Sequence, residues 1–210
     1  MKAIFYPEPF EAMHIPEQLK EMWIDRLYDQ FLIGREDMTI YDIGANIGLF
    51  SMLVAPYAKK IYAVEPQKDN FESLVKNLDF NGWSKVQPIN KAVTNSGEKV
   101  KLYLSPNQTA HNIITPMTQE GKFEEIDSIT IEELIKEPAD LVKLDVEGAE
   151  FEILCGKHFK AVAPNIKVII GEMHDWANRN FFQIKWALQE NGFRVKMFDY
   201  GAHFFLGEKV

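Results

Sequence analysis

Short apolar runs alternate with helix-patterned segments along most of this chain. The strand candidates are residues 39–43, 60–64, 85–90, 140–145, 166–171, 193–198 and 203–206. Strands separated by helices are typical of an α/β fold, in which helices cover both faces of a mostly parallel sheet. No internal repeat or low-complexity linker interrupts the pattern, so we expect a single globular unit.

Two segments lie outside this alternation. Residues 17–33 have the spacing of an amphipathic helix, which predicts an N-terminal helical extension over residues 1–37, ahead of a main domain of residues 38–210. Residues 99–104 alternate between apolar and polar side chains, so they predict an antiparallel strand in an insertion. The polar stretch 105–127 that follows is typical of a mobile loop or lid that helps to select a substrate.

Residues 40–48 place a carboxylate near the end of the first apolar run and two glycines after it. Asp42 closes the strand, Gly44 permits a sharp turn with a close backbone approach, and Gly48 allows the next helix to pack tightly. Asn46 tolerates the left-handed dihedral angles of such a bend. We interpret the segment as a ligand-binding turn, the alternative being an ordinary turn with incidental glycines.

The spacing of this turn limits the kind of nucleotide that it could bind. Dinucleotide folds carry G-x-G-x-x-G and P-loops end in Gly-Lys-Ser/Thr, and the sequence has neither. Glu65 ends the second strand candidate 17 residues after Gly48. In a βαβ unit an acid at this place binds two ribose hydroxyls, which predicts a nucleoside site. Alternatively, Glu65 only begins the helix-patterned segment 70–78.

Residues 139–150 form an acidic block at the end of another strand candidate. Lys143, Asp145 and Glu147 share one side of the strand by its period of two, and in open α/β sheets this end faces the ligand crevice. Neighbouring acids repel each other, which raises the pKa of one toward that of a useful base. In the alternative interpretation, Asp145 pairs with Lys143 while Glu147 and Glu150 complement a helix N-terminus. We favour function for Asp145 and the structural role for Glu150.

Glu172 and His174 follow the next strand candidate and share one face of it by the same period. His174 is therefore a second kind of candidate base. Together with Asp145 and Glu147, these residues would also suit an oxygen-rich site for a divalent ion such as Mg²⁺. The chain has no paired cysteines or H-x-x-x-H spacing, so a tighter transition-metal site is not indicated.

Composition narrows the cellular setting and the partners. The 210 residues are 46% apolar, enough for a full core, and the single cysteine, Cys155, excludes an internal disulfide framework. No apolar run reaches the ~18 residues of a membrane span, and the N-terminus lacks a signal-peptide core. We therefore expect a cytoplasmic protein without a membrane partner. A formal charge of −8 without a dense basic run argues against nucleic acid as the main partner.

Four ordered motifs carry a family resemblance. They are Asp-Ile-Gly-Ala-Asn-Ile-Gly-Leu-Phe-Ser at 42–51, Val-Glu-Pro at 64–66, Thr-Ile-Glu-Glu-Leu at 130–134 and Val-Lys-Leu-Asp-Val-Glu-Gly-Ala-Glu at 142–150. Together they resemble the signature of the FkbM family of methyltransferases over about residues 38–174, and the last block is the most distinctive. Where the family often has Leu-Asp in the third motif, this chain has Ile131 and Glu132, a change that affects only helix capping.

The resemblance implies a Rossmann-like class I methyltransferase domain with seven strands, mostly parallel, and an antiparallel last strand. It implies S-adenosylmethionine as methyl donor and a hydroxyl of a small molecule or sugar as acceptor. The implied cofactor-binding residues are Asp42, Gly44, Ala45, Asn46 and Gly48 around the methionine part, Glu65 with Pro66 at the ribose, Asn90 to Ala92 near the adenine, and Asp145 in the crevice. A hydroxyl acceptor also needs a base, for which the candidates are Asp145, Glu147 and His174.

Other functions stay open at this point. N-methylation and metal-assisted O-methylation fit the same motifs, and a non-catalytic S-adenosylmethionine-binding module would keep Asp42 and Glu65. Nucleic-acid amino-methyltransferases usually carry Asn/Asp-Pro-Pro-aromatic where this chain has Asp145-Val-Glu-Gly. We expect the acceptor to be selected by residues 105–127, the N-terminal helix and residues 176–182, whose aromatic side chains line a pocket or pack in the core. The oligomeric state is unknown.

Overall fold

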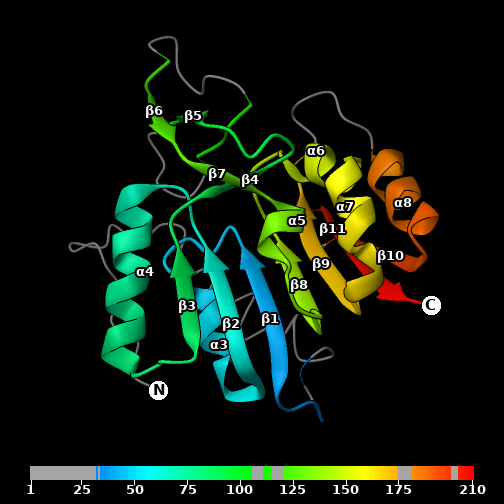
Figure 1. The fold of residues 1–210 in the computed structure, drawn as a ribbon, viewed down its shortest axis with the longest axis horizontal. Coiled ribbons are helices and arrows are strands. Elements are labelled where there is room, and N and C mark those ends of the chain that lie inside the picture. Colours follow the sequence, from blue (N-terminus) through cyan, green and yellow to red (C-terminus); the bar gives the residue numbers. More distant parts are fainter. Residues whose placement is uncertain (1–31, 33, 106–110, 115–120, 175–180, 200–202) are drawn as a thin grey trace.

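The fold is built on a seven-stranded sheet, seen in a computed structural model that describes residues 32, 34–105, 111–114, 121–174, 181–199 and 203–210 (Figure 1). The strand order is β10-β11-β9-β8-β1-β2-β3. The strands are β1 (Met38–Ile43), β2 (Ala58–Val64), β3 (Val86–Ile89), β8 (Leu141–Leu144), β9 (Val168–Met173), β10 (Phe193–Asp199) and β11 (His203–Lys209). Each coincides with one of the seven runs in the sequence, with ends displaced by a few residues.

The strand directions confirm a mostly parallel sheet with an antiparallel last strand. β1 pairs in parallel with β2 and β8, β2 with β3, and β8 with β9. β11 lies between β9 and β10 and is antiparallel to both. From the central pair β1 and β8 the chain continues toward opposite edges of the sheet. Their carboxyl ends therefore form the switch point at which open α/β sheets bind ligands.

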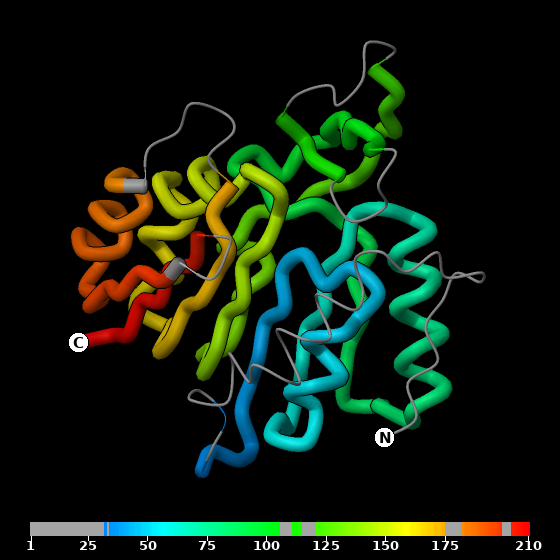
Figure 2. The backbone as a smooth tube through the Cα atoms, turned by 180° about the vertical axis from the view of Figure 1, so that it is seen from behind, coloured from blue at the N-terminus to red at the C-terminus, as the bar shows by residue number. Residues whose placement is uncertain are grey.

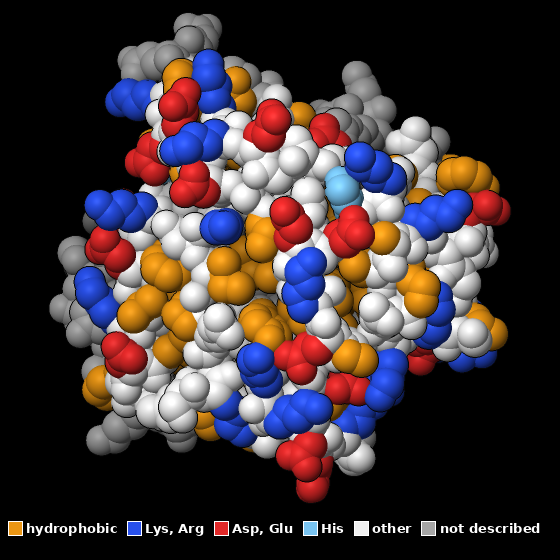
Figure 3. Space-filling model, in the orientation of Figure 1, with side chains coloured by type: hydrophobic (Ala, Val, Ile, Leu, Met, Phe, Trp, Pro, Cys, Tyr) orange, Lys and Arg blue, Asp and Glu red, His pale blue; other side chains and the backbone are white. Residues whose placement is uncertain are grey.

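Helices cover both faces of the sheet, as expected. They are α3 (Leu49–Val54), α4 (Lys68–Asn81), α5 (Ile131–Leu134), α6 (Glu150–Leu154), α7 (Lys157–Val162) and α8 (Phe181–Glu190), with 3₁₀ turns η2 (Ala55–Tyr57) and η3 (Ala163–Asn165). In Figure 1, α5 to α8 lie on the near face, and the reverse view in Figure 2 brings α3 to the front. The surface toward the viewer in Figure 3 mixes acidic and basic side chains around a central hydrophobic area.

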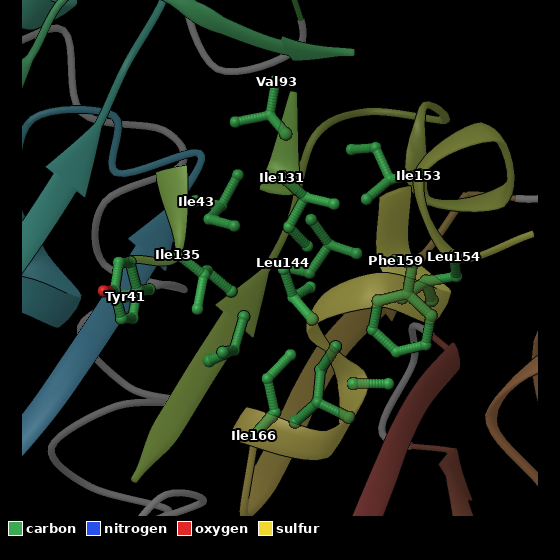
Figure 4. Packing of buried hydrophobic residues seen from close by; sticks show 14 of the residues in the cluster. Tyr41, Ile43, Val93, Ile131, Ile135, Leu144, Ile153, Leu154, Phe159 and Ile166 are labelled. Carbon is green, nitrogen blue, oxygen red and sulfur yellow. The ribbon is translucent and has the colours of Figure 1, made fainter. Parts of the chain in front are cut away.

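Two hydrophobic clusters, one on each face, hold these layers together. In β1, Tyr41 and Ile43 belong to the cluster shared with α5 to α8 (Figure 4), whereas Met38 and Ile40 belong to the cluster shared with α3 and α4. This division follows from the alternation of side chains along a strand. Burial of one large apolar side chain contributes about 1.5–3 kcal/mol relative to exposure, so both faces anchor the central strand.

An insertion stands beside the sheet between β3 and β8. The expected antiparallel strand is present as β5 (Val100–Tyr103), which pairs with β6 (Phe123–Ile126). The expected loop or lid at 105–127 is thus partly a strand. A short parallel pair, β4 (Ala92–Thr94) and β7 (Ser128–Thr130), was not expected, because three-residue strands leave too little periodicity to recognise. At the end of β7, Thr130 and Glu133 form a capping box that starts α5.

Some sequence expectations fall on parts of the chain outside the described residues. The N-terminal helix is one of these, and only its penultimate residue, Leu32, is described and buried. Trp176 also lies outside the described residues. Phe182, the second residue of α8, is 67% exposed, so it does not pack in the core, and it is not among the residues that line the cavity at the sheet edge. Cys155 is exposed. Among the described helices, none has the length and apolar character needed to cross a bilayer.

Candidate active site

A cavity of about 260 Å³ opens at the carboxyl ends of β1, β2, β8 and β9. The sequence-predicted residues that line it are Gly44, Ala45, Asn46, Glu65, Pro66, Ala92, Asp145, Glu147 and His174. Three other predicted residues, Asp42, Gly48 and Asn90, are not among the lining residues. The structure therefore brings most of the expected site together and leaves these three residues out of the cavity lining.

The turn after β1 requires the glycine at position 44. Gly44 has a φ of +83°, and a Cβ built on it would lie 1.7 Å from the backbone oxygen of Asp145. The backbone N–H groups of Gly44 and Ala45 both donate to the carbonyl of Val64 at 2.9 Å. Asn46 follows with a φ of +50°, as its tolerance of left-handed angles predicts. The ends of β1, β2 and β8 are thus held in direct backbone contact.

Asp42 and Gly48 support this turn from behind. The Asp42 carboxylate is fully buried and accepts a 2.6 Å hydrogen bond from Ser51 Oγ. Burial raises its pKa, against the opposing effect of Lys143 and Ser51. A Cβ on Gly48 would lie 2.5 Å from Leu74 Cδ1, so this glycine permits the close approach of α4. Both residues shape the cavity without lining it.

Lys143, in the fourth motif, contacts two residues of the first. Its Nζ donates to the carbonyl of Gly44 at 2.9 Å and forms ion pairs with Asp145 Oδ2 at 3.2 Å and Asp42 Oδ1 at 3.5 Å. The alternative pairing of Lys143 with Asp145 is therefore present. Sequence reasoning missed the bond to Gly44 and the pair with Asp42. The available signal was a lone lysine inside an apolar strand, because a buried ammonium requires acidic partners.

Glu65 is buried at the end of β2, and its carboxylate is held by the backbone. Oε2 accepts a hydrogen bond from Asn46 N at 2.8 Å, and Oε1 accepts one from Gln67 N at 2.9 Å. Burial raises the pKa of Glu65 to about 7 despite these two bonds. Asn90 Nδ2 donates to the carbonyls of Glu65 and Pro66. Asn90 thus fixes the turn that carries Glu65 instead of contacting the cavity.

His174 lies among the acids at the ends of β8 and β9. Its Nδ1 is 3.1 Å from Glu150 Oε1, while its Nε2 is 3.4 Å from Glu147 Oε2 and 3.8 Å from Glu172 Oε1. Burial lowers the pKa of His174, but the hydrogen bond to Glu150 and the surrounding carboxylates outweigh it and raise the pKa to about 10. This geometry favours an imidazolium at neutral pH, which argues against His174 as a base.

The two candidate acids of the fourth motif, Asp145 and Glu147, differ in charge environment. Burial favours the neutral form of Asp145, but Lys143 and His174 lower its pKa below the ordinary value. Burial raises the pKa of Glu147 to about 7; His174 opposes this change, and Asp145, Glu172 and Glu150 add to it. The expected rise in the pKa of one acid is therefore present, with burial as its largest cause. Glu147 also has a φ of +52°, a strained angle of the kind that clusters at functional sites.

Glu150 has the structural role favoured from the sequence and a contact that was not foreseen. Its Oε1 accepts hydrogen bonds from Val146 N at 2.9 Å and Gly148 N at 3.2 Å, closing the turn after β8. The same oxygen faces His174. The side chain is fully buried, so the turn and the histidine are held by one carboxylate.

The insertion supplies the remaining wall of the cavity. Leu102, His111, Asn112 and Ile113 line it, in agreement with the expectation that residues 105–127 contribute to the site. Ser105 N donates to His111 Nδ1 at 3.0 Å, and burial lowers the pKa of this histidine. Both effects favour a neutral ring with its proton on Nε2, because Nδ1 is the acceptor.

Known proteins resemble this chain in sequence. A model of the methyltransferase FkbM domain matches residues 42–195. Hexuronic acid methyltransferase AglP of Haloferax volcanii is 29% identical over 145 residues, which cover 67% of this chain and 58% of AglP. Methyltransferase 1 of Beauveria bassiana is 24% identical over 222 residues, covering 90% of this chain and 85% of that protein. The chain thus spans less than two thirds of the length of AglP.

Solved structures show the same fold at lower sequence identity. The methyltransferase FkbM of Methylobacillus flagellatus superposes with a TM-score of 0.58 at 14% identity, over 81% of this chain and 43% of that chain. A SAM-dependent methyltransferase of Aquifex aeolicus gives a TM-score of 0.56 at 13% identity, over 98% of both chains. These neighbours have the Rossmann-like class I methyltransferase fold. Because the family model covers well over half of its residues, the chain belongs to the FkbM methyltransferase family.

Proposed function

We propose that this protein transfers a methyl group from S-adenosylmethionine to a hydroxyl group of a small molecule or sugar. The observation that carries the proposal is the convergence of three sequence motifs on one cavity. Glu65 accepts a hydrogen bond from the Gly44–Asn46 turn, and that turn contacts the backbone of Asp145. The cavity therefore has a ribose-binding acid, a close-approach turn and an acidic wall at the switch point of the sheet.

The residues present fit S-adenosylmethionine. Glu65 would bind the ribose hydroxyls, because each of its oxygens accepts one backbone hydrogen bond and has lone-pair capacity left. The Gly44–Asn46 turn would hold the methionine part, and Ala92, Val93 and Ile113 give an apolar wall suited to adenine. When bound, the cofactor supplies a methyl group already activated by a sulfonium, so the protein contributes mainly alignment, worth up to about 7–11 kcal/mol in well-oriented reactions.

For the base we propose Glu147. Asp145 is committed to an ion pair with Lys143, and both ring nitrogens of His174 face carboxylates. Glu147 lines the cavity, and its Oε2 lies 3.4 Å from His174 Nε2, beyond the length of a normal hydrogen bond. A carboxylate in this position can take the proton of an acceptor hydroxyl. An amine acceptor would instead enter as a cation and form ion pairs with the same acids. The relative AglP is a hexuronic acid methyltransferase, which supports a sugar as the acceptor class.

Calorimetric titration tests the cofactor. The wild-type protein should bind S-adenosylmethionine and its demethylated product saturably, with NADH as a negative control. Glu65→Gln should bind on the order of 10–100-fold more weakly, because charge-assisted hydrogen bonds are lost and the new amide group faces a backbone N–H donor. The matched control is Glu124→Gln on exposed β6. A folded wild-type protein that binds neither ligand would contradict the proposal. If the wild-type protein binds the cofactor, the next step is an acceptor screen with sugars, other alcohols and amines.

The pKa of Glu65 gives a pH-dependent prediction. Ribose hydroxyls donate to the ionised carboxylate, and with a pKa of about 7 this form is scarce at pH 6 and dominant at pH 8. Affinity for 5′-methylthioadenosine, which has the ribose but no titrating amino acid, should therefore rise about tenfold from pH 6 to pH 8. Fluorescence or calorimetric titration measures it. Glu65→Gln should show a flat profile, and affinity that falls with rising pH would refute this role.

A further inference from the structure

Four carboxylates meet a single imidazole at the edge of the cavity. Asp145, Glu147 and Glu172 line the cavity together with His174. Glu150 approaches the same ring from the buried side, 3.1 Å from Nδ1. One ligand atom each from Asp145, Glu150 and His174 lies within 4.8 Å of the others. This spacing is close enough for one ion to reach all three after small side-chain movements.

Glu150 provides an independent observation. Its side chain is fully buried, and Oε1 is occupied by Val146 N, Gly148 N and the ring of His174. Oε2 of the same carboxylate is also buried and has no hydrogen-bond partner among the described residues. A buried carboxylate oxygen without a partner is costly. The site therefore has an unused ligand atom in a place from which water is excluded.

We propose that Asp145, Glu150 and His174 bind one divalent cation of the Mn²⁺ type. Carboxylate oxygens suit Mg²⁺, Ca²⁺ and Mn²⁺, and an imidazole nitrogen shifts the preference toward the transition metals. No thiolate lies in the group, so a soft metal is not favoured. Binding would release the ring proton of His174, because a metal-bound imidazole is neutral. The ion would then replace that positive charge among the carboxylates and would give Glu150 Oε2 a partner.

Such an ion would also select the acceptor, an inference that rests on the proposed methyl transfer. Asp145 and His174 line the cavity, so a cation held by them would have coordination positions facing the acceptor. An acceptor with two adjacent hydroxyl oxygens, such as a vicinal diol of a sugar, could fill two of these positions. The ion would lower the pKa of the bound hydroxyl, and Glu147, beside His174, is placed to take its proton.

Direct titration with Mn²⁺ tests the site without cofactor or activity. The full chain, treated with EDTA and dialysed, is titrated while electron paramagnetic resonance follows free Mn²⁺. We expect saturable binding of one ion per chain, with affinity lowered about 10–100-fold or more in Glu150→Gln. This variant keeps an oxygen acceptor for the two backbone amides. The control is Glu152→Gln, the same change on the exposed side of α6, which should bind like the wild type.

The outcomes separate the site from adventitious binding and from the proposed function. Equal Mn²⁺ affinity in Glu150→Gln and Glu152→Gln, or no saturable binding to the wild type, would overturn the proposal. If Glu150→Gln does not fold, a second measurement tests the site: the electron spin-echo modulation of bound Mn²⁺ that a coordinated imidazole nitrogen causes. It should be present in the Mn²⁺-loaded wild type and absent in His174→Ala, and its absence from the wild type would refute the site. Cofactor binding, measured separately in EDTA, can succeed or fail independently of either result.

Discussion

Replacing Glu147 with glutamine is expected to lower turnover by about 10²–10⁴-fold, the usual contribution of a positioned general base. Glutamine keeps the shape of the side chain but cannot accept the hydroxyl proton. Because Glu65 and the Gly44 turn would hold the cofactor, the affinity for S-adenosylmethionine should stay within a few-fold. Steady-state methyl transfer to an acceptor found by the screen, together with calorimetric cofactor binding, measures both quantities.

The control for this experiment is Glu172→Gln. Both substitutions remove one negative charge next to Nε2 of His174, at 3.4 Å for Glu147 and 3.8 Å for Glu172. A loss of charge alone would affect the two variants similarly, whereas loss of the base affects only Glu147→Gln. Equal turnover in both variants would therefore remove Glu147 as the base.

Lys143→Met is expected to lower the free energy of unfolding by about 3–5 kcal/mol, the usual effect of removing one partner from a buried ion pair. Asp42 is fully buried and Lys143 is 5% exposed, so water cannot replace the lost ammonium. The substitution also removes the hydrogen bond to the carbonyl of Gly44. Urea denaturation followed by circular dichroism gives the change, with the slope checked for two-state behaviour.

Two further variants show whether burial of the ion pair causes this loss of stability. Lys60→Met removes the partner of Glu137 in a half-exposed pair, and it should destabilise the protein much less than Lys143→Met, because water replaces an exposed partner. Adding Asp42→Asn to Lys143→Met should restore part of the lost stability, because the uncompensated charge is removed with its partner. Similar losses for the two lysine variants would show that the pair of Lys143 with Asp42 has no special weight.

The sequence was informative where a single segment carries the signal. The seven buried runs became the seven strands, and the left-handed angles of Gly44, Asn46 and Gly48 follow from residue types that tolerate them. The placement of the first two at the cavity could be expected from the switch-point rule. Local patterns of this kind depend only on residues near each other in the chain.

The site features that were missed depend on distant segments. Lys143 reaches Asp42 because the register of β1 and β8 sets these residues side by side, although they are far apart in sequence. The contact of Glu150 with His174 likewise requires β9 to follow β8 in the sheet. Asp42 and Gly48 were expected at the ligand because a motif does not show which of its residues face the cavity, and Asn90 was expected there from its place after the third strand. These contacts depend on which strands pair in three dimensions, and the order of residues along the chain does not reveal that pairing.

The position of β11 has a consequence for biosynthesis. Because β11 separates β9 from β10, neither of these strands can complete its hydrogen bonding until residues 203–209 have left the ribosome. Until then β9 presents an open edge, and the buried place of Phe205 is unfilled. An open strand edge beside exposed apolar surface is a template for association with other chains. Nascent chains stalled before residue 203 should therefore depend on chaperones, although all of the cofactor motifs have already been translated.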